Sequence, residues 1–244
     1  MSNEYEGYSK EYSKEELIEV AEKQQLRITA LEQMLIRQNG FLQKWNEHVI
    51  ELLGALVEYR NLESREHIAR VKNYTRILGE EVQRSLPEYE LTSQQLDIII
   101  ATSPLHDVGK IAIPDEIILK PGKLTDEEFD YMKSHSLSGF EILERLKDIW
   151  PDEYQRYAME IAHFHHERYD GNGYPEGYEG DQIPISAQIV SIADVYDALV
   201  HERVYKAAIP RDRAFRMIMD GECGVFDPKL LHCLDACREE LEKY

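Results

Sequence analysis

Two columns of mostly apolar residues, each with a spacing of seven, run through the first quarter of the chain. One column holds Ala21, Ile28, Leu35, Leu42, Val49 and Leu56. The other column holds Leu17, Gln24, Leu31, Gln38, Trp45 and Leu52. Columns three and four residues apart form the seam of a coiled coil, so the pattern predicts a long helix that pairs with a second copy as a parallel homodimer. The alternative is an amphipathic helix that packs against the rest of its own chain.

The limits of this helix follow from the residues on either side of the seam. Residues 1–12 are polar and aperiodic, which predicts a flexible tail. Ser13 and Glu16 have the spacing of a capping box, which marks a helix start. The seam fades near Val57, so we expect three parts: the tail 1–12, a helical dimerisation segment 13–57 and a domain 58–244.

Apolar spacings of three and four recur in the rest of the chain and predict a mainly helical domain. The expected helices cover 62–86, 91–106, 125–147, 153–165, 186–200, 211–220 and 228–242, separated by proline and glycine. Mild alternation over 111–119 predicts at most a small β-hairpin. The fold class expected from the pattern is therefore all-α.

Composition narrows the range of partners. The chain has 28 Lys and Arg against 47 Asp and Glu, a formal charge of −19. This balance argues against coating nucleic acid, because phosphate binding requires an excess of basic residues, but it permits a small anion in a local basic pocket. Cys223, Cys233 and Cys237 are too few for a disulfide framework. Since no segment resembles a signal peptide or a membrane span, the sequence predicts a cytoplasmic protein.

Histidines beside carboxylates are the candidate chemistry. His106-Asp107 ends one expected helix, where the pair can offer a nitrogen and an oxygen to one cation while the second carboxylate oxygen reaches another. His165-His166 closes a second expected helix just before a glycine-rich loop. Taken singly, the His-Asp pair is also explained by chance, because this dipeptide is common, and the His-His pair by two capping or solvent-facing histidines.

Further positions could complete a metal centre. Asp194 lies in a helix that is apolar almost all round, where a buried carboxylate needs a metal or a salt bridge. Glu63 and His67 share a helix face, and His135 lies on another helix; a surface hydrogen bond and a structural role are the respective alternatives. Nitrogen and oxygen ligands without thiolate favour iron or manganese, with zinc as a further candidate, and adjacent metals suit phosphoester hydrolysis.

The motifs and their order resemble a known family. Residues 106–110 (HDVGK) resemble the signature of the HD superfamily of metal-dependent phosphohydrolases. Residues 165–175 (HHERYDGNGYP) are similar to the long signature of its HD-GYP subfamily. Residues 113–115, 120–122, 192–194 and 226–228 also match, in the expected order. The resemblance covers residues 58–235 and leaves the N-terminal helix outside.

The resemblance implies an HD-type helical bundle that hydrolyses cyclic di-GMP to pGpG, GMP or both, by attack of a metal-activated hydroxide. The metal ligands that it implies are His67, His106, Asp107, His135, His165, His166 and Asp194. Two or three divalent ions, iron or manganese, are expected, and Glu63 occupies the position that accompanies a third metal. Asp107 would bridge metals, and Lys110 would stabilise charge at the scissile phosphate.

The same resemblance implies a binding site for the dinucleotide. The substrate-contacting positions fall on Gly173, Tyr174, Pro175, Arg203 and Lys206. Val204 stands where the family usually has proline, which we expect to change loop stiffness. The expected partners are cyclic di-GMP, a second copy of the chain and an upstream sensory or signalling protein. The alternatives are a catalytically silent cyclic-dinucleotide sensor or scaffold, and an HD hydrolase for another cyclic dinucleotide such as cyclic GMP-AMP.

Overall fold

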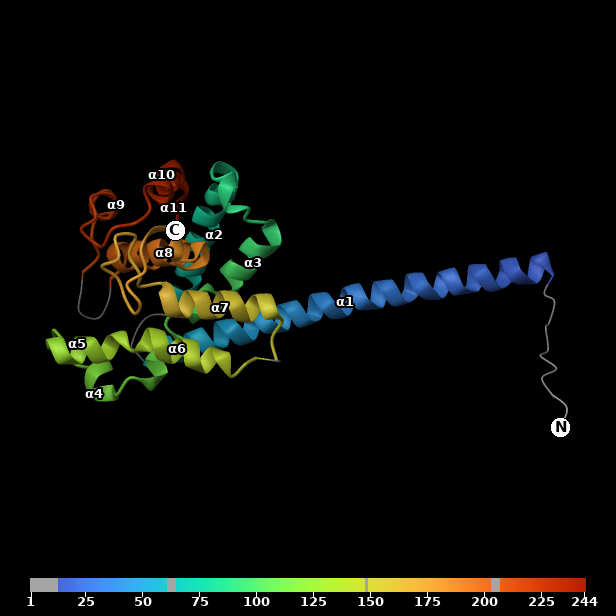
Figure 1. Cartoon of the computed structure of the whole chain (residues 1–244), viewed down its shortest axis with the longest axis horizontal. Helices are drawn as coiled ribbons and strands as arrows, with labels where there is room; N and C mark the ends of the chain where they lie inside the picture. The colour runs from blue at the N-terminus through green and yellow to red at the C-terminus, as the bar shows by residue number, and fades with distance from the viewer. Residues whose placement is uncertain (1–12, 61–64, 148, 203–206) are drawn as a thin grey trace, which may run out of the picture. The chain divides into compact units, whose positions relative to one another are not determined.

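The computed structural model describes residues 13–60, 65–147, 149–202 and 207–244, and their regular structure is helical (Figure 1). The α-helices are α1 (Lys14–Arg60), α2 (Arg65–Ser85), α3 (Ser93–Thr102), α4 (Asp115–Ile118), α5 (Asp126–Lys133), α6 (His135–Glu144), α7 (Asp152–Phe164), α8 (Ile185–Val200), α9 (Arg211–Met219), α10 (Pro228–Ala236) and α11 (Arg238–Leu241). The 3-10 turns are η1 (Pro87–Tyr89), η2 (Ser103–Leu105), η3 (Val108–Ala112) and η4 (Gly180–Gln182). The expected all-α fold is confirmed.

Helix α1 extends through two compact units, 1–46 and 47–244. Ser13 and Glu16 cap its start reciprocally, each accepting the backbone N–H of the other. Within the second unit, Ile50, Gly54 and Val57 are buried on one face of the helix. The boundary that the sequence places after Val57 therefore lies inside α1, which ends at Arg60.

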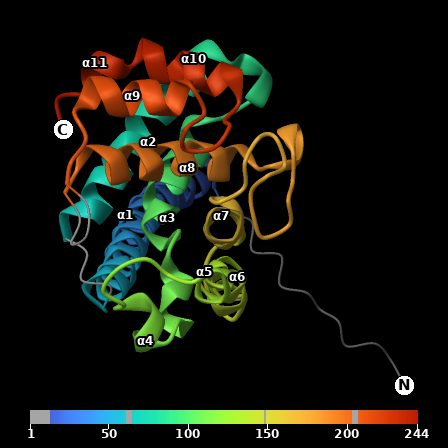
Figure 2. The ribbon, with the colours of Figure 1, turned by 90° about the vertical axis from the view of Figure 1, so that its left-hand side faces the viewer.

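The core of the second unit is formed where α2, α3, α7 and α8 pack against one another. Figure 2 shows α9, α10 and α11 on one side of α8, with α4, α5 and α6 on the other. The rings of Tyr74 and Tyr196 meet edge to face at 5.0 Å between α2 and α8. Fully buried isoleucines from α3, α7 and α8 fill the space between, each contributing about 1.5–3 kcal/mol of burial free energy.

Three local predictions are wrong. Residues 111–119 do not form a β-hairpin: the segment closes η3, passes through Pro114 and forms the short helix α4. Pro114 directly precedes α4, and the carbonyl groups of Lys110 and Ile111 accept hydrogen bonds from the Arg60 side chain rather than from a partner strand. The described residues contain two isolated β-bridges and no strand. The expected helix 125–147 is divided at Ser134 into α5 and α6, and the expected helix 228–242 is divided at Cys237 into α10 and α11.

No helix in the described ranges is both long and apolar enough to cross a bilayer.

Candidate metal centre

The 3-10 turn η2 follows α3 directly. The His106-Asp107 pair lies between η2 and the next 3-10 turn, η3. The Cβ atom of any residue replacing Gly109 would overlap the carbonyl oxygen of His135 and the amide nitrogen of Gly139. Glycine therefore lets η3 lie directly against the start of α6. This contact brings the first residue of α6, His135, to the side chain of Asp107.

Four of the predicted ligands form a first group: Asp107, His135, His165 and His166. One ligand atom from each of them lies within 4.8 Å of the others. The Nε2 atoms of His135 and His165 are 3.3 and 3.7 Å from Oδ1 of Asp107. His165 and His166 reach this group because α7 ends at Phe164, just before them.

The other three predicted ligands, His67, His106 and Asp194, form a second group. The Nε2 atoms of His67 and His106 are 3.7 and 3.8 Å from Oδ1 of Asp194. Nε2 of His106 is also 3.3 Å from Oδ2 of Asp107. The Asp107 carboxylate therefore has one oxygen toward each group.

The Nδ1 atoms of four histidines each bond to an oxygen outside the groups. For His106, His135 and His165 this is the carbonyl oxygen of Ser103, Met132 and Ile161 respectively, at 2.8–3.0 Å. For His67 it is Oδ2 of Asp197, at 2.7 Å. A proton donated from Nδ1 leaves the lone pair of a neutral imidazole on Nε2, the atom that faces the group.

The arrangement fits divalent cations. The separations of 3.3–3.8 Å between imidazole and carboxylate atoms exceed the length of an ordinary hydrogen bond. Nε2 of His67, Nε2 of His106 and Oδ1 of Asp107 are buried without a hydrogen-bond partner among the described residues. Buried polar atoms need a partner, and a cation between such nitrogen and oxygen atoms provides one.

The electrostatics differ between the two groups. Burial lowers the pKa of His135 to about 4 and the pKa of His166 well below its usual value, so both imidazoles are neutral at pH 7. Burial also opposes the charge on His106, but Asp107 and Asp194 outweigh it and raise the pKa of His106 to about 10. The second group therefore attracts positive charge, and a proton competes with a metal ion for it.

Asp197 connects the second group to α2 and was missed by the sequence analysis. Its buried carboxylate accepts hydrogen bonds from His67 and from Nε and Nη2 of Arg70, at 2.5 and 3.2 Å. Burial acts to raise the pKa of Asp197, but these bonds lower it to about 2. Its place one helical turn after Asp194 is the sequence signal, since residues three apart share a face.

Lys110 and Tyr174, predicted to contact substrate, lie beside Asp107 and His166 respectively. Nζ of Lys110 is 2.6 Å from Oδ2 of Asp107. The Tyr174 ring stacks on His166 with a centroid separation of 4.6 Å and an interplanar angle of 29°. Both side chains are thus next to the predicted ligands.

The loop that carries Tyr174 is held by residues whose role the sequence analysis did not assign. The buried carboxylate of Glu167 accepts the backbone N–H groups of Glu176, Gly177 and Tyr178 at 2.7–3.1 Å. Nη1 of Arg168 donates to the carbonyl oxygens of His165 and Glu167 and to Oγ of Ser191. Glu167 and Arg168 therefore hold this loop and the end of α7 in place.

The remaining predicted residues are placed as follows. Gly173 lies against the backbone of Glu167 and Arg168, where a Cβ atom would overlap it, and Pro175 is exposed. Glu63, Arg203 and Lys206 lie outside the described residues.

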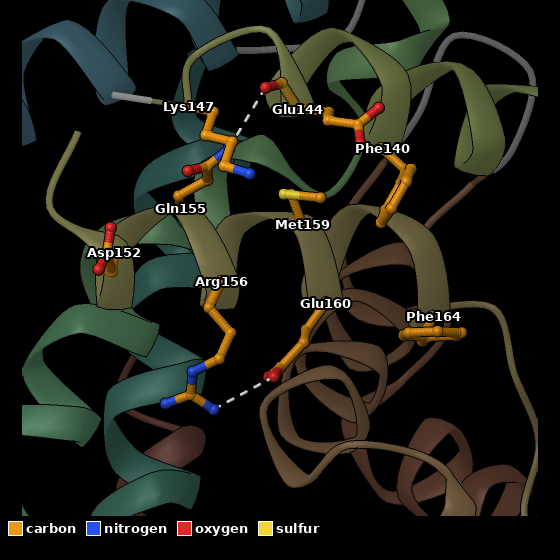
Figure 3. Close-up of a pocket in the computed structure, with 9 residues that line it drawn as sticks. All are labelled: Phe140, Glu144, Lys147, Asp152, Gln155, Arg156, Met159, Glu160 and Phe164. Carbon is orange, nitrogen blue, oxygen red and sulfur yellow. Dashed lines mark hydrogen bonds and ion pairs between the residues drawn. The ribbon is translucent and has the colours of Figure 1, made fainter. Parts of the chain in front are cut away.

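A separate pocket of about 510 Å³ lies on α6 and α7 (Figure 3). Phe140, Met159 and Phe164 form its apolar part, and Arg156 and Glu160, one turn apart on α7, pair at its edge at 3.2 Å. It contains none of the predicted site residues, so it is not part of the metal centre.

Fold and site together define an all-helical protein with a centre of histidines and carboxylates. A family model described as HD domain matches residues 29–230, so the chain belongs to the HD domain family. The relatives below confirm the resemblance to its HD-GYP subfamily.

A cyclic di-GMP phosphodiesterase of Vibrio cholerae is 41% identical over 191 residues, which cover 77% of this chain and 39% of the relative. A 3′3′-cGAMP-specific phosphodiesterase 2 of the same organism is 40% identical over 193 residues, which cover 79% of this chain and 35% of the relative. This chain thus spans less than half the length of either relative. A solved HDG"Y"P protein of Bdellovibrio bacteriovorus shares the fold, with a TM-score of 0.54 and 19% identity over 71% of this chain and 51% of that one.

Proposed function

We propose that this chain is a metal-dependent phosphodiesterase that hydrolyses cyclic di-GMP to pGpG, GMP or both. One observation carries the proposal: four imidazoles, each bonded to oxygen through Nδ1, direct Nε2 toward the carboxylates of Asp107 and Asp194. The phosphodiesterase of Vibrio cholerae, named for cyclic di-GMP, supports the substrate class.

The residues have distinct roles in this proposal. Bound divalent ions would supply an activated water and neutralise the charge that develops on the phosphate. Asp107, with one oxygen toward each group, would hold ions on both sides. Lys110 would place a positive charge at the phosphate oxygens, where it stabilises the transition state. The ring of Tyr174, stacked on His166, would border the nucleotide.

We propose iron or manganese as the metal, because the described ligands are imidazoles and carboxylates without a thiolate. A third ion would bind with the help of Glu63, as the family resemblance implies. Arg203 and Lys206 would bind the substrate phosphates, the arginine through two parallel hydrogen bonds and the lysine as a point charge.

A second substrate has support of its own. The relative named for 3′3′-cGAMP is nearly as similar to this chain as the one named for cyclic di-GMP, at 40% against 41% identity. The two dinucleotides share their phosphate diesters and differ in one base. A metal centre and a basic pair act on the shared part, so hydrolysis of cyclic GMP-AMP is the second candidate activity.

The other finer expectations are proposals as well. We propose a homodimer through the exposed seam of α1, which would transmit input from an upstream sensory or signalling protein. The cytoplasmic location stays a prediction of the sequence.

The test combines metal analysis and turnover on one anaerobically purified sample. Two or three iron or manganese ions per chain, with pGpG or GMP formed from cyclic di-GMP, would support the proposal. Faster hydrolysis of 3′3′-cGAMP in a parallel reaction would favour the second substrate. Full metal content without any product, or no metal and no product, would contradict the enzyme proposal and favour a silent sensor or scaffold.

A further inference from the structure

The last residue of α1, Arg60, bonds to the segment that directly follows the His106-Asp107 pair. Its Nη1 atom donates to the carbonyl oxygens of Lys110 and Ile111 at 3.0 and 2.8 Å. Its Nη2 atom donates to the carbonyl oxygen of Ile113 and to Oδ1 of Asp115, both at 2.6 Å. Nε donates to the same Asp115 oxygen at 3.1 Å. One guanidinium thus joins residues 50 to 55 positions away in the sequence.

These contacts close the end of the 3-10 turn η3. Carbonyl groups at the end of a helical turn have few partners within it: that of Lys110 accepts the Ile113 N–H, and a cation with several donors can bond to it and to the carbonyl groups beyond. Arginine presents five N–H donors in a fixed planar arrangement, so one side chain can bond to three carbonyl oxygens and a carboxylate together. The exposed ion pair with Asp115 contributes little by itself, and the bonds to the backbone define the geometry.

The segment that Arg60 holds carries the side chain closest to Asp107. Lys110 contributes its carbonyl oxygen to Arg60 and its Nζ atom to Oδ2 of Asp107, at 2.6 Å. The backbone position of Lys110 therefore depends on Arg60, while its ammonium group lies at the metal centre. A displacement of this backbone would move the ammonium group away from Asp107.

Helix α1 also contacts the chain on the other side of the His106-Asp107 pair. A Cβ atom at Gly54 would lie 2.7 Å from the carbonyl oxygen of Pro104, in η2. The close approach of α1 at Gly54 and the bonds from Arg60 thus flank the pair before and after it in the sequence. The exposed residues Leu52 and Leu56, which continue the heptad columns, lie on the same part of the helix.

We infer that Arg60 is a positioning residue: it fixes the backbone of residues 110–113 and thereby holds Lys110 at the metal centre, so that the end of α1 controls the rate of hydrolysis. The inference rests on the proposed function for its kinetic part. Its structural part, the immobilisation of residues 110–113 by Arg60, can be measured without substrate.

The experiment compares the full chain with its Arg60→Ala and Arg60→Lys variants by amide hydrogen exchange and steady-state kinetics. The amides of Lys110 and Ile113 bond within η3, to the carbonyl oxygens of Asp107 and Lys110, so their exchange reports on this turn. We expect faster exchange over 108–113 in Arg60→Ala, together with a loss of about ten- to a hundredfold in kcat and a smaller change in KM. Arg60→Lys retains a charged donor but not the planar arrangement of five N–H donors. Its amide exchange and its kcat should therefore fall between those of the wild type and those of Arg60→Ala.

The matched control is Arg238→Ala. Arg238 is exposed to a similar degree, 34% against 30%, and also pairs with an aspartate distant in sequence, Asp212. Unchanged exchange over 108–113 in Arg60→Ala, or faster exchange with unchanged kcat, would overturn the inference. If the wild-type chain hydrolyses no cyclic dinucleotide, the proposed function fails, and unchanged exchange in Arg60→Ala would separately refute the contact.

Discussion

At the scale of single residues, the two ligand groups meet at Asp107. Its carboxylate lies 3.3 Å from imidazole nitrogens on both sides, through Oδ1 to His135 and through Oδ2 to His106. Its pKa is held well below the usual value, because the positive charges of Lys110 and His106 outweigh the effect of burial, which acts in the opposite direction. The group is therefore an anion at neutral pH and is available to metal ions.

Replacing Asp107 by alanine is expected to abolish hydrolysis and to remove most of the bound metal, because both groups lose a ligand. Metal analysis and product chromatography on the same preparation would measure both effects. His232→Ala is a suitable control, since His232 is exposed on α10 and belongs to neither group. Full turnover in Asp107→Ala would show that the metal centre is not responsible for the chemistry.

Asp197→Asn tests a contact just outside the ligand groups. The amide keeps one oxygen that accepts hydrogen bonds, but it loses the charge that holds Arg70 and can present an N–H group to His67. We expect metal affinity to fall by about 10–100-fold, as for other groups that orient a ligating histidine. Titration of the metal-free protein with Mn²⁺ would measure the affinity. Asp212→Asn, on α9, is the control and should bind the metal as the wild type does.

The difference between Asp107 and Asp197 shows what the sequence can predict about a site. Asp107 stands in a short motif next to a histidine, and such local patterns can be read directly. Asp197 bonds to His67 across 130 positions, and Arg60 to Ile113 across 53. The spacing of Asp197 from Asp194 places both on one helix face, but the partners of Asp197 and Arg60 depend on how helices pack, which no local pattern contains.

At the scale of elements, the close packing of η3 against α6 positions two of the predicted metal ligands, Asp107 and His135. Alanine at position 109 would overlap the backbone of α6 at His135 and Gly139. We expect Gly109→Ala to lower the free energy of unfolding by about 1–3 kcal/mol, as for other overpacked sites, and to lower metal content, since His135 is displaced from Asp107. Thermal or denaturant unfolding together with metal analysis would test both expectations.

Gly40→Ala is the matched control for Gly109→Ala. Gly40 lies inside α1, and a Cβ atom there meets no other atom within 4 Å. Alanine is favoured over glycine within a helix by about 0.5–1 kcal/mol, so this variant should be more stable than wild type. Equal effects of the two substitutions would contradict the packing argument.

The elements of the fold also differ in how far their sequences determine them. The long helices were predictable because a period near 3.6 extends over several turns in α2, α7 and α8. The segment 111–119 was not, because it contains only short elements whose geometry depends on Pro114 and on Arg60 of another helix. Short segments carry too few positions for a period to decide between a hairpin and a turn.

At the scale of the whole molecule, α1 presents two faces with different roles. Ile50, Gly54 and Val57 are buried within the unit 47–244, whereas the heptad columns remain exposed along the helix, for example at Leu31 and Leu35. A helix with an exposed apolar seam gains stability by pairing with another helix. This is the physical basis for the proposed homodimer.

The dimer can be tested with neighbouring residues of similar character. Leu35 belongs to a heptad column and is 58% exposed, while Ile36, at 71%, belongs to neither column. Glutamate at position 35 would bury charge in the seam of both helices, so we expect Leu35→Glu to be monomeric by sedimentation velocity. Ile36→Glu should stay dimeric, because its side chain points away from the seam. A wild-type chain that is monomeric at micromolar concentration, or equal effects of the two substitutions, would show that α1 does not pair through its heptad columns.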